Sequence, residues 1–159
     1  MDDERWLNAE QLAAWKKLIA VVSLAPGVLD AQLQRDADLT HFEYFTLAML
    51  SEAPERTLRM TALASRTNAT LSRLSHVVSR LEARGYVTRT PCPSDRRATN
   101  ASLTEEGWRK VVATAPGHVE TVCARMLDAL DERDVADLDR IMSRVLTRLD
   151  PEGRFLPGD

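Results

Sequence analysis

The apolar residues of this 159-residue chain recur mostly at the spacing of α-helices. A first helix is expected between about residues 5 and 35. Its apolar positions are Leu12, Trp15, Leu18, Ile19 and Val22. Pro26-Gly27 is expected to kink or break this helix, because proline lacks the backbone N–H that a helix needs. The helix then resumes through Leu29 and Leu33.

Three more helices are expected next. Thr40-His41-Phe42-Glu43 has the form of a capping box, which starts a helix that runs to about Ser51. A short helix from about Met60 to Arg66 is followed by a turn at residues 67–70. The longer helix after that turn ends at Gly85, a typical C-terminal cap. Its apolar stripe is Leu71, Leu74, Val77, Val78 and Leu81.

The pattern after Gly85 changes from a helical period to that of a strand. Residues 86–90 (Tyr-Val-Thr-Arg-Thr) are β-branched or aromatic and alternate as in a strand. Residues 91–100 are expected to form a polar loop, and residues 101–103 to pair back as the second strand. The sequence therefore predicts a β-hairpin here.

Two helices complete the chain. Thr104 caps one that runs toward Leu130, and Pro116-Gly117 is expected to kink or break it. Asp131 caps the last helix. Its apolar stripe is Val135, Leu138, Ile141, Met142, Val145 and Leu149. A domain this small cannot cover every such stripe, so we expect this one to pack against a second copy of the chain.

Composition places the chain among soluble proteins. It is 44% hydrophobic and 28% charged, which is ordinary for a globular domain. The longest apolar run, residues 18–25, is far shorter than the roughly 20 residues of a membrane helix. The acidic start, Met1-Asp2-Asp3-Glu4, has the wrong sign for a leader, and Cys92 and Cys123 do not imply a disulfide framework. The protein is predicted to be cytoplasmic.

Charge is distributed unevenly along the chain. Residues 54–100 contain nine arginines and three acidic residues, a net charge of +6, whereas the whole chain has a net charge of −3. A basic block in an otherwise acidic protein indicates a local surface for a polyanion. The block coincides with the predicted short helix, turn, longer helix and hairpin, which is the layout of a helix-turn-helix followed by a wing.

Two parts of this block have the side chains that bind DNA. The outer face of the longer helix has short hydrogen-bonding residues and arginines, which suit base edges and phosphates in a major groove. These candidates are Thr70, Ser72, Arg73, His76 and Arg80. Arg96 and Arg97 in the hairpin are suited to a minor groove. Asp95 either orients a neighbouring guanidinium or shapes the turn.

The ordered set of motifs in this region resembles the MarR family of bacterial transcriptional regulators. The resemblance covers about residues 58–107 in detail. It is carried by Leu63-Ala64-Ser65-Arg66-Thr67, Leu71-Ser72-Arg73, the run from Arg80 to Arg89, Asp95-Arg96-Arg97, and Leu103-Thr104-Glu105-Glu106-Gly107. It implies a homodimer with interlocked terminal helices that holds two winged-helix lobes over a palindromic operator in double-stranded DNA.

The resemblance also implies a small-molecule effector, often phenolic, bound between the dimer helices and the DNA-binding lobe. The candidates by position are Trp15, His41, Tyr44 and His118, although Trp15 and Tyr44 also suit a hydrophobic core. No cofactor or metal site is predicted, because no Cys or His pair has ligand spacing. Cys92 lies at the foot of the wing, and a structural role is expected for it before a redox role.

The sequence therefore predicts a mainly α-helical fold: a winged helix-turn-helix with a small β-hairpin wing, plus N- and C-terminal dimerisation helices. The expected divisions are residues 1–38 and 108–159 for dimerisation and 39–107 for DNA binding. The function predicted is a homodimeric repressor relieved by a phenolic-type ligand. An enzyme is not predicted, because phosphate-loop and nucleophile motifs are missing. The alternatives are a winged-helix protein-interaction module and a redox- or metal-responsive regulator.

Overall fold

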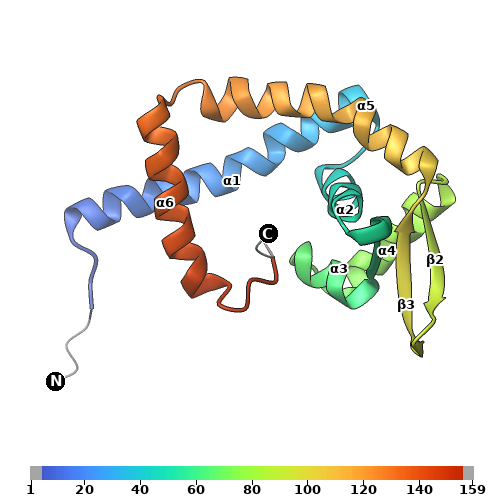
Figure 1. The fold of residues 1–159 in the computed structure, drawn as a ribbon. Helices are drawn as coiled ribbons and strands as arrows, with labels where there is room; N and C mark the ends of the chain where they lie inside the picture. Colours follow the sequence, from blue (N-terminus) through green and yellow to red (C-terminus); the bar gives the residue numbers. More distant parts are fainter. Residues whose placement is uncertain (1–4, 156–159) are drawn as a thin grey trace.

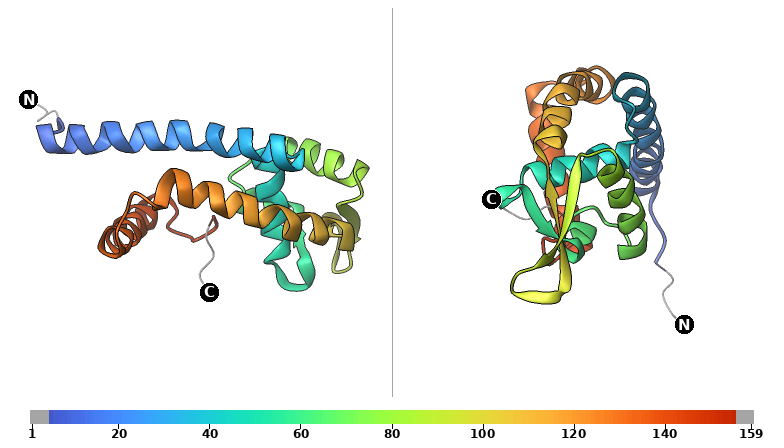
Figure 2. Two further views of the ribbon diagram at one scale, coloured as in Figure 1. Left: turned by 90° about the horizontal axis from the view of Figure 1, so that it is seen from above. Right: turned by 90° about the vertical axis from the view of Figure 1, so that its right-hand side faces the viewer.

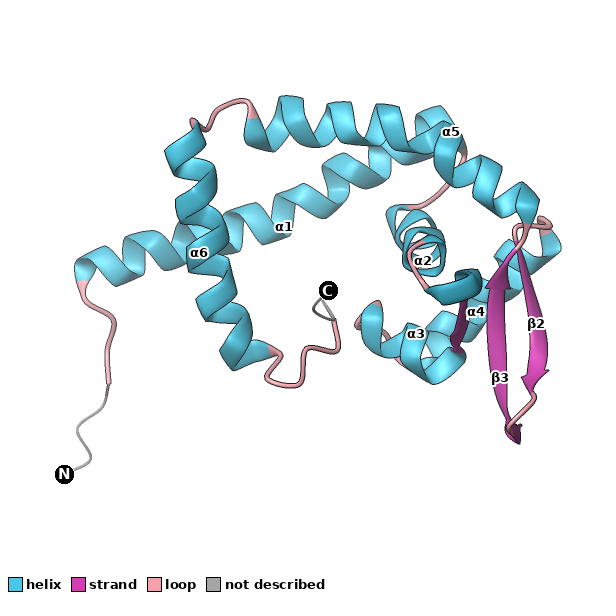
Figure 3. Ribbon diagram, in the orientation of Figure 1, coloured by secondary structure: helices cyan, strands magenta, loops and turns pink. Residues whose placement is uncertain are grey.

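The computed structural model describes residues 5–155 and shows a mainly helical chain with one small sheet (Figures 1 and 3). The helices are α1 (Ala9–Ala37), α2 (His41–Ser51), α3 (Met60–Arg66), α4 (Leu71–Ala83), α5 (Glu105–Val122) and α6 (Glu132–Leu149). The strands are β1 (Thr57–Arg59), β2 (Val87–Cys92) and β3 (Asp95–Leu103). A 3₁₀ turn, η1 (Pro54–Arg56), precedes β1, and a π-helical turn, η2 (Cys123–Leu127), follows α5. Residues 1–4, the acidic start of the chain, lie outside the described range.

Helices α2, α3 and α4 pack with the sheet into a lobe around one apolar core. The strands are antiparallel in the order β1-β3-β2, and β2 and β3 form a hairpin that projects from the lobe (Figure 2). The largest fully buried side chains are mostly leucines from the end of α1 and from α2, α3 and α4. They are Leu33, Leu39, Leu47, Leu50, Leu63, Leu74, Leu81, Val78, Val87 and Thr46. This is the predicted winged helix-turn-helix arrangement.

The helix ends of the lobe confirm the predictions from local sequence. Thr40 caps α2, and Glu43 completes the capping box by accepting from the Thr40 backbone N–H at 2.9 Å. Helix α3 spans the predicted residues, and Thr70 caps α4. Gly85 follows α4 with a φ of +78°, a conformation that glycine adopts without a steric penalty.

The two internal prolines do not break their helices, so of the two outcomes predicted for each, a kink or a break, the break does not occur. Helix α1 is continuous through Pro26, and α5 is continuous through Pro116 to Val122. Each proline removes one backbone hydrogen bond from a helix of 29 or 18 residues, and the two helices pack side by side, which holds the remaining turns in place. Figure 1 shows that α5 changes direction along its length without interruption.

The wing is longer than predicted. Strand β3 begins at Asp95, so most of the expected polar loop at residues 91–100 is strand, and Cys92 pairs directly with Asp95 across a tight turn. The polar residues at the start of β3 are strand through pairing with β2, whereas Thr57–Arg59 adds a third strand only beside residues 100–102. This strand, β1, was not predicted, because three residues are too few to show a period.

The terminal helices leave a large apolar surface exposed. The N-terminal half of α1 extends away from the lobe, and α6 overlaps it in Figure 1 but lies apart from it in Figure 2. Exposed apolar residues of α6 include Val135, Leu138, Ile141 and Leu149. By length and apolar composition alone α1 could cross a membrane, and its apolar stretch is exposed. This does not overturn the prediction made from the longest apolar run, because length and composition alone do not show that a helix crosses a membrane.

Candidate nucleic-acid interface

The outer face of α4 presents the predicted polar side chains to solvent. Thr70, Ser72, Arg73, His76 and Arg80 are all exposed, while the opposite face of the helix is buried in the core. The Thr70 hydroxyl accepts a hydrogen bond from the Arg73 backbone N–H at 3.2 Å, so this residue fixes the start of α4. The structure therefore brings the predicted residues of α4 onto one surface.

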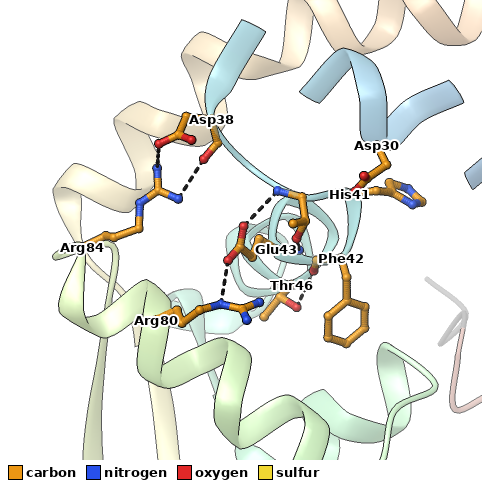
Figure 4. A network of polar contacts seen from close by, with 9 residues as sticks. Asp30, Asp38, His41, Phe42, Glu43, Thr46, Arg80 and Arg84 are labelled. Carbon is orange, nitrogen blue, oxygen red and sulfur yellow. Dashed lines mark hydrogen bonds and ion pairs between the residues drawn. The ribbon is translucent and has the colours of Figure 1, made fainter. Parts of the chain in front are cut away.

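The two arginines on this face are held by consecutive residues of α2. The Arg73 guanidinium lies over the Phe42 ring, with its carbon 4.3 Å from the ring centroid. Arg80 donates from Nε to a Glu43 carboxylate oxygen at 3.1 Å (Figure 4). Between α4 and the start of α2 lies a groove of about 600 Å³. The groove is lined by Asp30, Thr40, Phe42, Thr70, Ser72, Arg73, His76, Val77 and Arg80.

A third arginine ties the end of α4 to the corner between α1 and α2. Both terminal nitrogens of Arg84 donate to Asp38, one to its carbonyl at 2.8 Å and the other to its carboxylate at 3.1 Å. Asp38 ends α1 in a left-handed conformation, with a φ of 51°. On the α1 side of the corner, the Asp30 carboxylate accepts from the His41 backbone N–H at 2.8 Å (Figure 4). Helix α4 and the long helix α1 are therefore linked through one polar corner.

The wing presents Arg97 as an exposed residue next to its turn. The Asp95 carboxylate accepts from the Arg97 backbone N–H at 3.0 Å. A carboxylate that accepts from a backbone N–H two residues later shapes a turn, which is one of the two roles considered for Asp95. The side chain of Arg96 lies outside what the structure describes. The wing turn and the outer face of α4 are joined by a second groove, lined in part by Ser75, Arg89 and Arg97.

An ion pair anchors the wing to α4. The Glu82 carboxylate accepts three hydrogen bonds from Arg89: from the backbone N–H at 3.1 Å, from Nε at 3.0 Å and from Nη2 at 2.7 Å. The donated hydrogen bonds of the Arg89 side chain hold the pKa of Glu82 below its usual value. Because Glu82 is on α4 and Arg89 on β2, this contact fixes the angle between the helix and the hairpin.

Three of the four predicted ligand-contacting residues lie together where α2 meets α5. The His118 ring centroid is 4.7 Å from that of Tyr44 and 6.3 Å from that of His41. Burial lowers the pKa of both histidines, and burial also raises the pKa of Tyr44. His118 Nδ1 is buried without a hydrogen-bond partner among the described residues.

Trp15 does not belong to this cluster. It lies on the exposed N-terminal half of α1 with half of its surface accessible. Fifteen residues of helix separate it from Asp30, which contacts His41, and this is roughly 20 Å along the axis. Trp15 and Tyr44 were also predicted to suit a hydrophobic core. Tyr44 is buried in the core, whereas Trp15 is not.

The remaining candidate chemistry is accounted for by local contacts. Cys92 lies beside the turn of the wing, at the end of β2, and not at the foot of the wing as predicted. It is buried 3.3 Å from the Ser94 hydroxyl, and this hydrogen bond lowers the pKa of its thiol. Within residues 5–155 no group of three or more His, Cys, Asp or Glu side chains is arranged to hold a metal ion. The rings of His41 and His118 lie 6.3 Å apart, but the Glu43 carboxylate on the same helix as His41 accepts from Thr40 and Arg80 and does not join them as a third ligand.

The sequence did not reveal the residues that contact and position the arginines of this surface. Phe42, Glu43, Asp38 and Glu82 each hold an arginine of the basic block. Glu43 and Phe42 were visible only as parts of a helix cap. Their partners lie 31 to 46 residues away along the chain, except for Glu82, whose partner Arg89 is seven residues away.

Comparisons with known proteins agree on one family. A family model described as MarR family matches residues 37–98. The chain is 44% identical to Sco3205, a MarR family transcriptional regulator from Streptomyces coelicolor solved in complex with DNA; the match covers 99% of this chain and 98% of that one, with a TM-score of 0.88. It is 35% identical to AbsC, another MarR family regulator from the same organism, over 93% and 99% of the two chains, with a TM-score of 0.86.

Curated relatives match over a shorter region. The transcriptional repressor YetL from Bacillus subtilis is 30% identical over 94 residues, which is 59% of this chain and 56% of that protein. The match to the regulator YdcH, from the same organism, spans 55% of its length. The chain thus spans little more than half the length of these curated relatives. All of these proteins are regulators and not enzymes. With 44% identity to one solved member along nearly all of both chains, the protein belongs to the MarR family of transcriptional regulators.

Proposed function

We propose that this protein is a homodimeric transcriptional repressor that binds a palindromic operator in double-stranded DNA and is released by a small, phenolic-type ligand. One observation carries the proposal: the exposed arginine-bearing face of α4 and the arginine-bearing wing lie on one lobe of a chain 44% identical to a regulator solved with DNA. This arrangement gives a helix for the major groove and a hairpin for the minor groove.

In this proposal α4 enters the major groove. Ser72, Arg73 and His76 reach base edges or nearby phosphates, and Thr70 fixes the start of the helix. Arg80 contacts the DNA backbone. Arg97, together with Arg96, reaches the minor groove, where the negative potential attracts guanidinium groups.

The proposed dimer forms through the terminal helices, residues 1–38 and 108–159, and leaves residues 39–107 to bind DNA. The exposed apolar surfaces of α1 and α6 support this division, because a soluble chain rarely leaves such large patches uncovered. On α1 these residues are Trp6, Leu7, Leu12, Trp15, Ile19, Val21, Val22, Leu24 and Val28. The same surface explains the apolar character of α1 without a membrane, in keeping with a cytoplasmic protein. The likeness to the repressor YetL supports repression as the sign of regulation.

The test is binding to the DNA upstream of the gene for this protein, titrated in salt against a scrambled duplex of equal length. We expect a sequence-dependent complex of one dimer per site whose affinity falls as salt rises, because lysine and arginine contacts release counterions from phosphates. Light scattering of the same complex gives the stoichiometry. Equal affinity for both duplexes at every salt concentration would count against operator recognition, and a 1:1 complex would count against the dimer.

The ligand part of the proposal rests on the cluster of His41, Tyr44 and His118. Aromatic rings from α2 and α5 meet there beside α1, and two buried polar atoms, His118 Nδ1 and Gln32 Oε1, have no hydrogen-bond partner among the described residues. A phenolic ligand supplies a ring to stack and a hydroxyl to hydrogen-bond. Binding there would act at the junction of the dimer helices and the lobe.

Replacing His118 by phenylalanine is expected to abolish release of the operator by phenolic compounds while leaving operator affinity unchanged. Phenylalanine keeps a flat ring beside Tyr44 but removes the nitrogen that has no partner, so the fold is preserved. The measurement is fluorescence anisotropy of a labelled operator duplex, titrated with a panel of simple phenols. Equal release of the wild type and the variant would contradict the assignment of His118.

A further inference from the structure

We propose that Phe42 and Glu43, in the first turn of α2, are positioning residues that hold Arg73 and Arg80 of α4 ready for DNA phosphates. The inference rests on the proposed function, since it assumes that α4 faces DNA. It adds to that function that α2, which does not itself enter a groove of the DNA, sets the positions of the two arginines before DNA binds.

Glu43 is a buried carboxylate with two defined partners. Its side chain is only 7% exposed, whereas that of Arg80 is 59% exposed. One carboxylate oxygen accepts from the Thr40 backbone N–H at 2.9 Å and the other from Arg80 Nε at 3.1 Å. A buried carboxylate without a cation is costly, so the structure strongly favours keeping Arg80 at this place.

The contact uses only one edge of the Arg80 guanidinium. Nε is bound to Glu43, while the two terminal nitrogens carry the remaining four N–H groups, which suit a phosphate. Arg84, one turn further along α4, differs in this respect: both of its terminal nitrogens donate to Asp38. Arg84 therefore has a structural role, whereas Arg80 is held at Nε and keeps the N–H groups of its terminal nitrogens for a ligand.

Phe42 supports Arg73 in a different way. Its ring lies under the guanidinium at 4.3 Å, a distance at which the cation and the ring attract each other. A stack on the ring restricts the side chain but leaves the N–H groups in the guanidinium plane able to donate. Arg73 and Arg80 are seven residues apart, about two helical turns, so both face the same side of α4.

The groove between α2 and α4 is lined by both arginines, so one ligand bound in it can contact both. It is about 600 Å³, and Thr40, Ser72 and His76 add hydrogen-bonding groups to its lining. Asp30 also lines it, but its two carboxylate oxygens accept from the His41 backbone N–H and from the Gln34 side chain. A strand of the phosphodiester backbone fits this pattern of exposed cationic donors along an open groove.

The test is a double-mutant cycle on operator binding with Glu43→Gln and Arg80→Ala. Glutamine keeps the capping box, because either Glu or Gln can accept from the Thr40 backbone N–H, but it removes the charge that holds Arg80. We expect Glu43→Gln to weaken operator binding about fivefold and Arg80→Ala about tenfold or more. In the Arg80→Ala background, Glu43→Gln should change the affinity less than twofold, because the two act through one contact.

The matched control is Glu52→Gln, which makes the same change of charge at the exposed C-terminal end of the same helix. It should leave operator affinity unchanged or slightly higher, because the lost negative charge repelled DNA. A second cycle with Phe42→Leu and Arg73→Ala should show the same non-additivity. Thermal unfolding of each variant shows whether any loss of affinity reflects loss of fold.

A readout without DNA separates this inference from the proposed function. In the free wild-type protein, nitrogen relaxation of the Arg80 Nε–H group should show an ordered side chain, and Glu43→Gln should make it mobile on the nanosecond scale. Operator binding with additive variants, or a mobile Arg80 in the wild type, would overturn the inference and leave the proposed function standing. No operator complex with the wild type would overturn both.

Discussion

Replacing Gly107 by alanine is expected to destabilise the protein by about 3 kcal/mol, the upper end of what overpacking a core usually costs. A Cβ at this position would lie 2.7 Å from the Leu103 Cδ1 atom and still closer to the carbonyl oxygen of Tyr86. That oxygen cannot move away freely, because it accepts from the Thr104 backbone N–H at 3.0 Å. The first turn of α5 would therefore have to separate from the end of α4 and the sheet.

The measurement is thermal unfolding at fixed protein concentration, where a loss of this size lowers the midpoint by roughly 6–12 °C. Gly117→Ala in the same helix is the matched control. A Cβ there would be 3.5 Å from the Gln32 side chain, an ordinary contact, so alanine should be neutral or stabilising by up to about 1 kcal/mol. Equal midpoints for the two variants would show that the approach of α5 to Tyr86 is looser than the structure indicates.

Replacing Arg97 by alanine is expected to cost about 1–3 kcal/mol in operator binding and to leave the fold intact. Its side chain is exposed, and its backbone N–H donates to the Asp95 carboxylate at 3.0 Å. The loss should depend on the sequence of the minor groove that the wing reaches, because a narrow A·T-rich groove attracts arginine most strongly. The operator titration described above, repeated with A·T-rich and G·C-rich flanks, measures both effects.

Arg109→Ala is the matched control for this variant. Arg109 is equally cationic and exposed, but it lies in the first turns of α5, at the opposite end of the hairpin from the wing turn, where it pairs with Glu106. Its replacement should change operator affinity little beyond the general loss of one positive charge. Wild-type affinity in the Arg97 variant would refute the assignment of the wing to the minor groove.

Local sequence signals predicted the winged helix-turn-helix lobe well because the residues that start and end its helices lie within those helices or next to them. The Thr40 capping box, the Thr70 cap and Gly85 each act within a few residues, so no knowledge of the rest of the fold was needed. The exposed face of α4 followed from its apolar stripe, since the stripe fixes the opposite side of the helix.

Features set by distant contacts could not be predicted in the same way. Helix α1 continues through Pro26 because packing against α5 outweighs one lost hydrogen bond, and a single sequence does not show that packing. Strand β1 and the long β3 stabilise each other across the sheet. Of the four ligand candidates, the three on α2 and α5 converge, but Trp15 could be placed only once the length of α1 was known.

The exposed apolar length of α1 has a consequence for how the protein assembles. The core of the lobe extends from Leu33 to Val111, whereas within residues 5–155 the N-terminal half of α1 and most of the apolar stripe of α6 are exposed. The lobe can therefore form in a first-order step, while covering the terminal helices in the proposed dimer requires an encounter between two chains. A higher concentration of newly made protein would accelerate only the second step. At low concentration the folded lobes would therefore form well before the terminal helices pair.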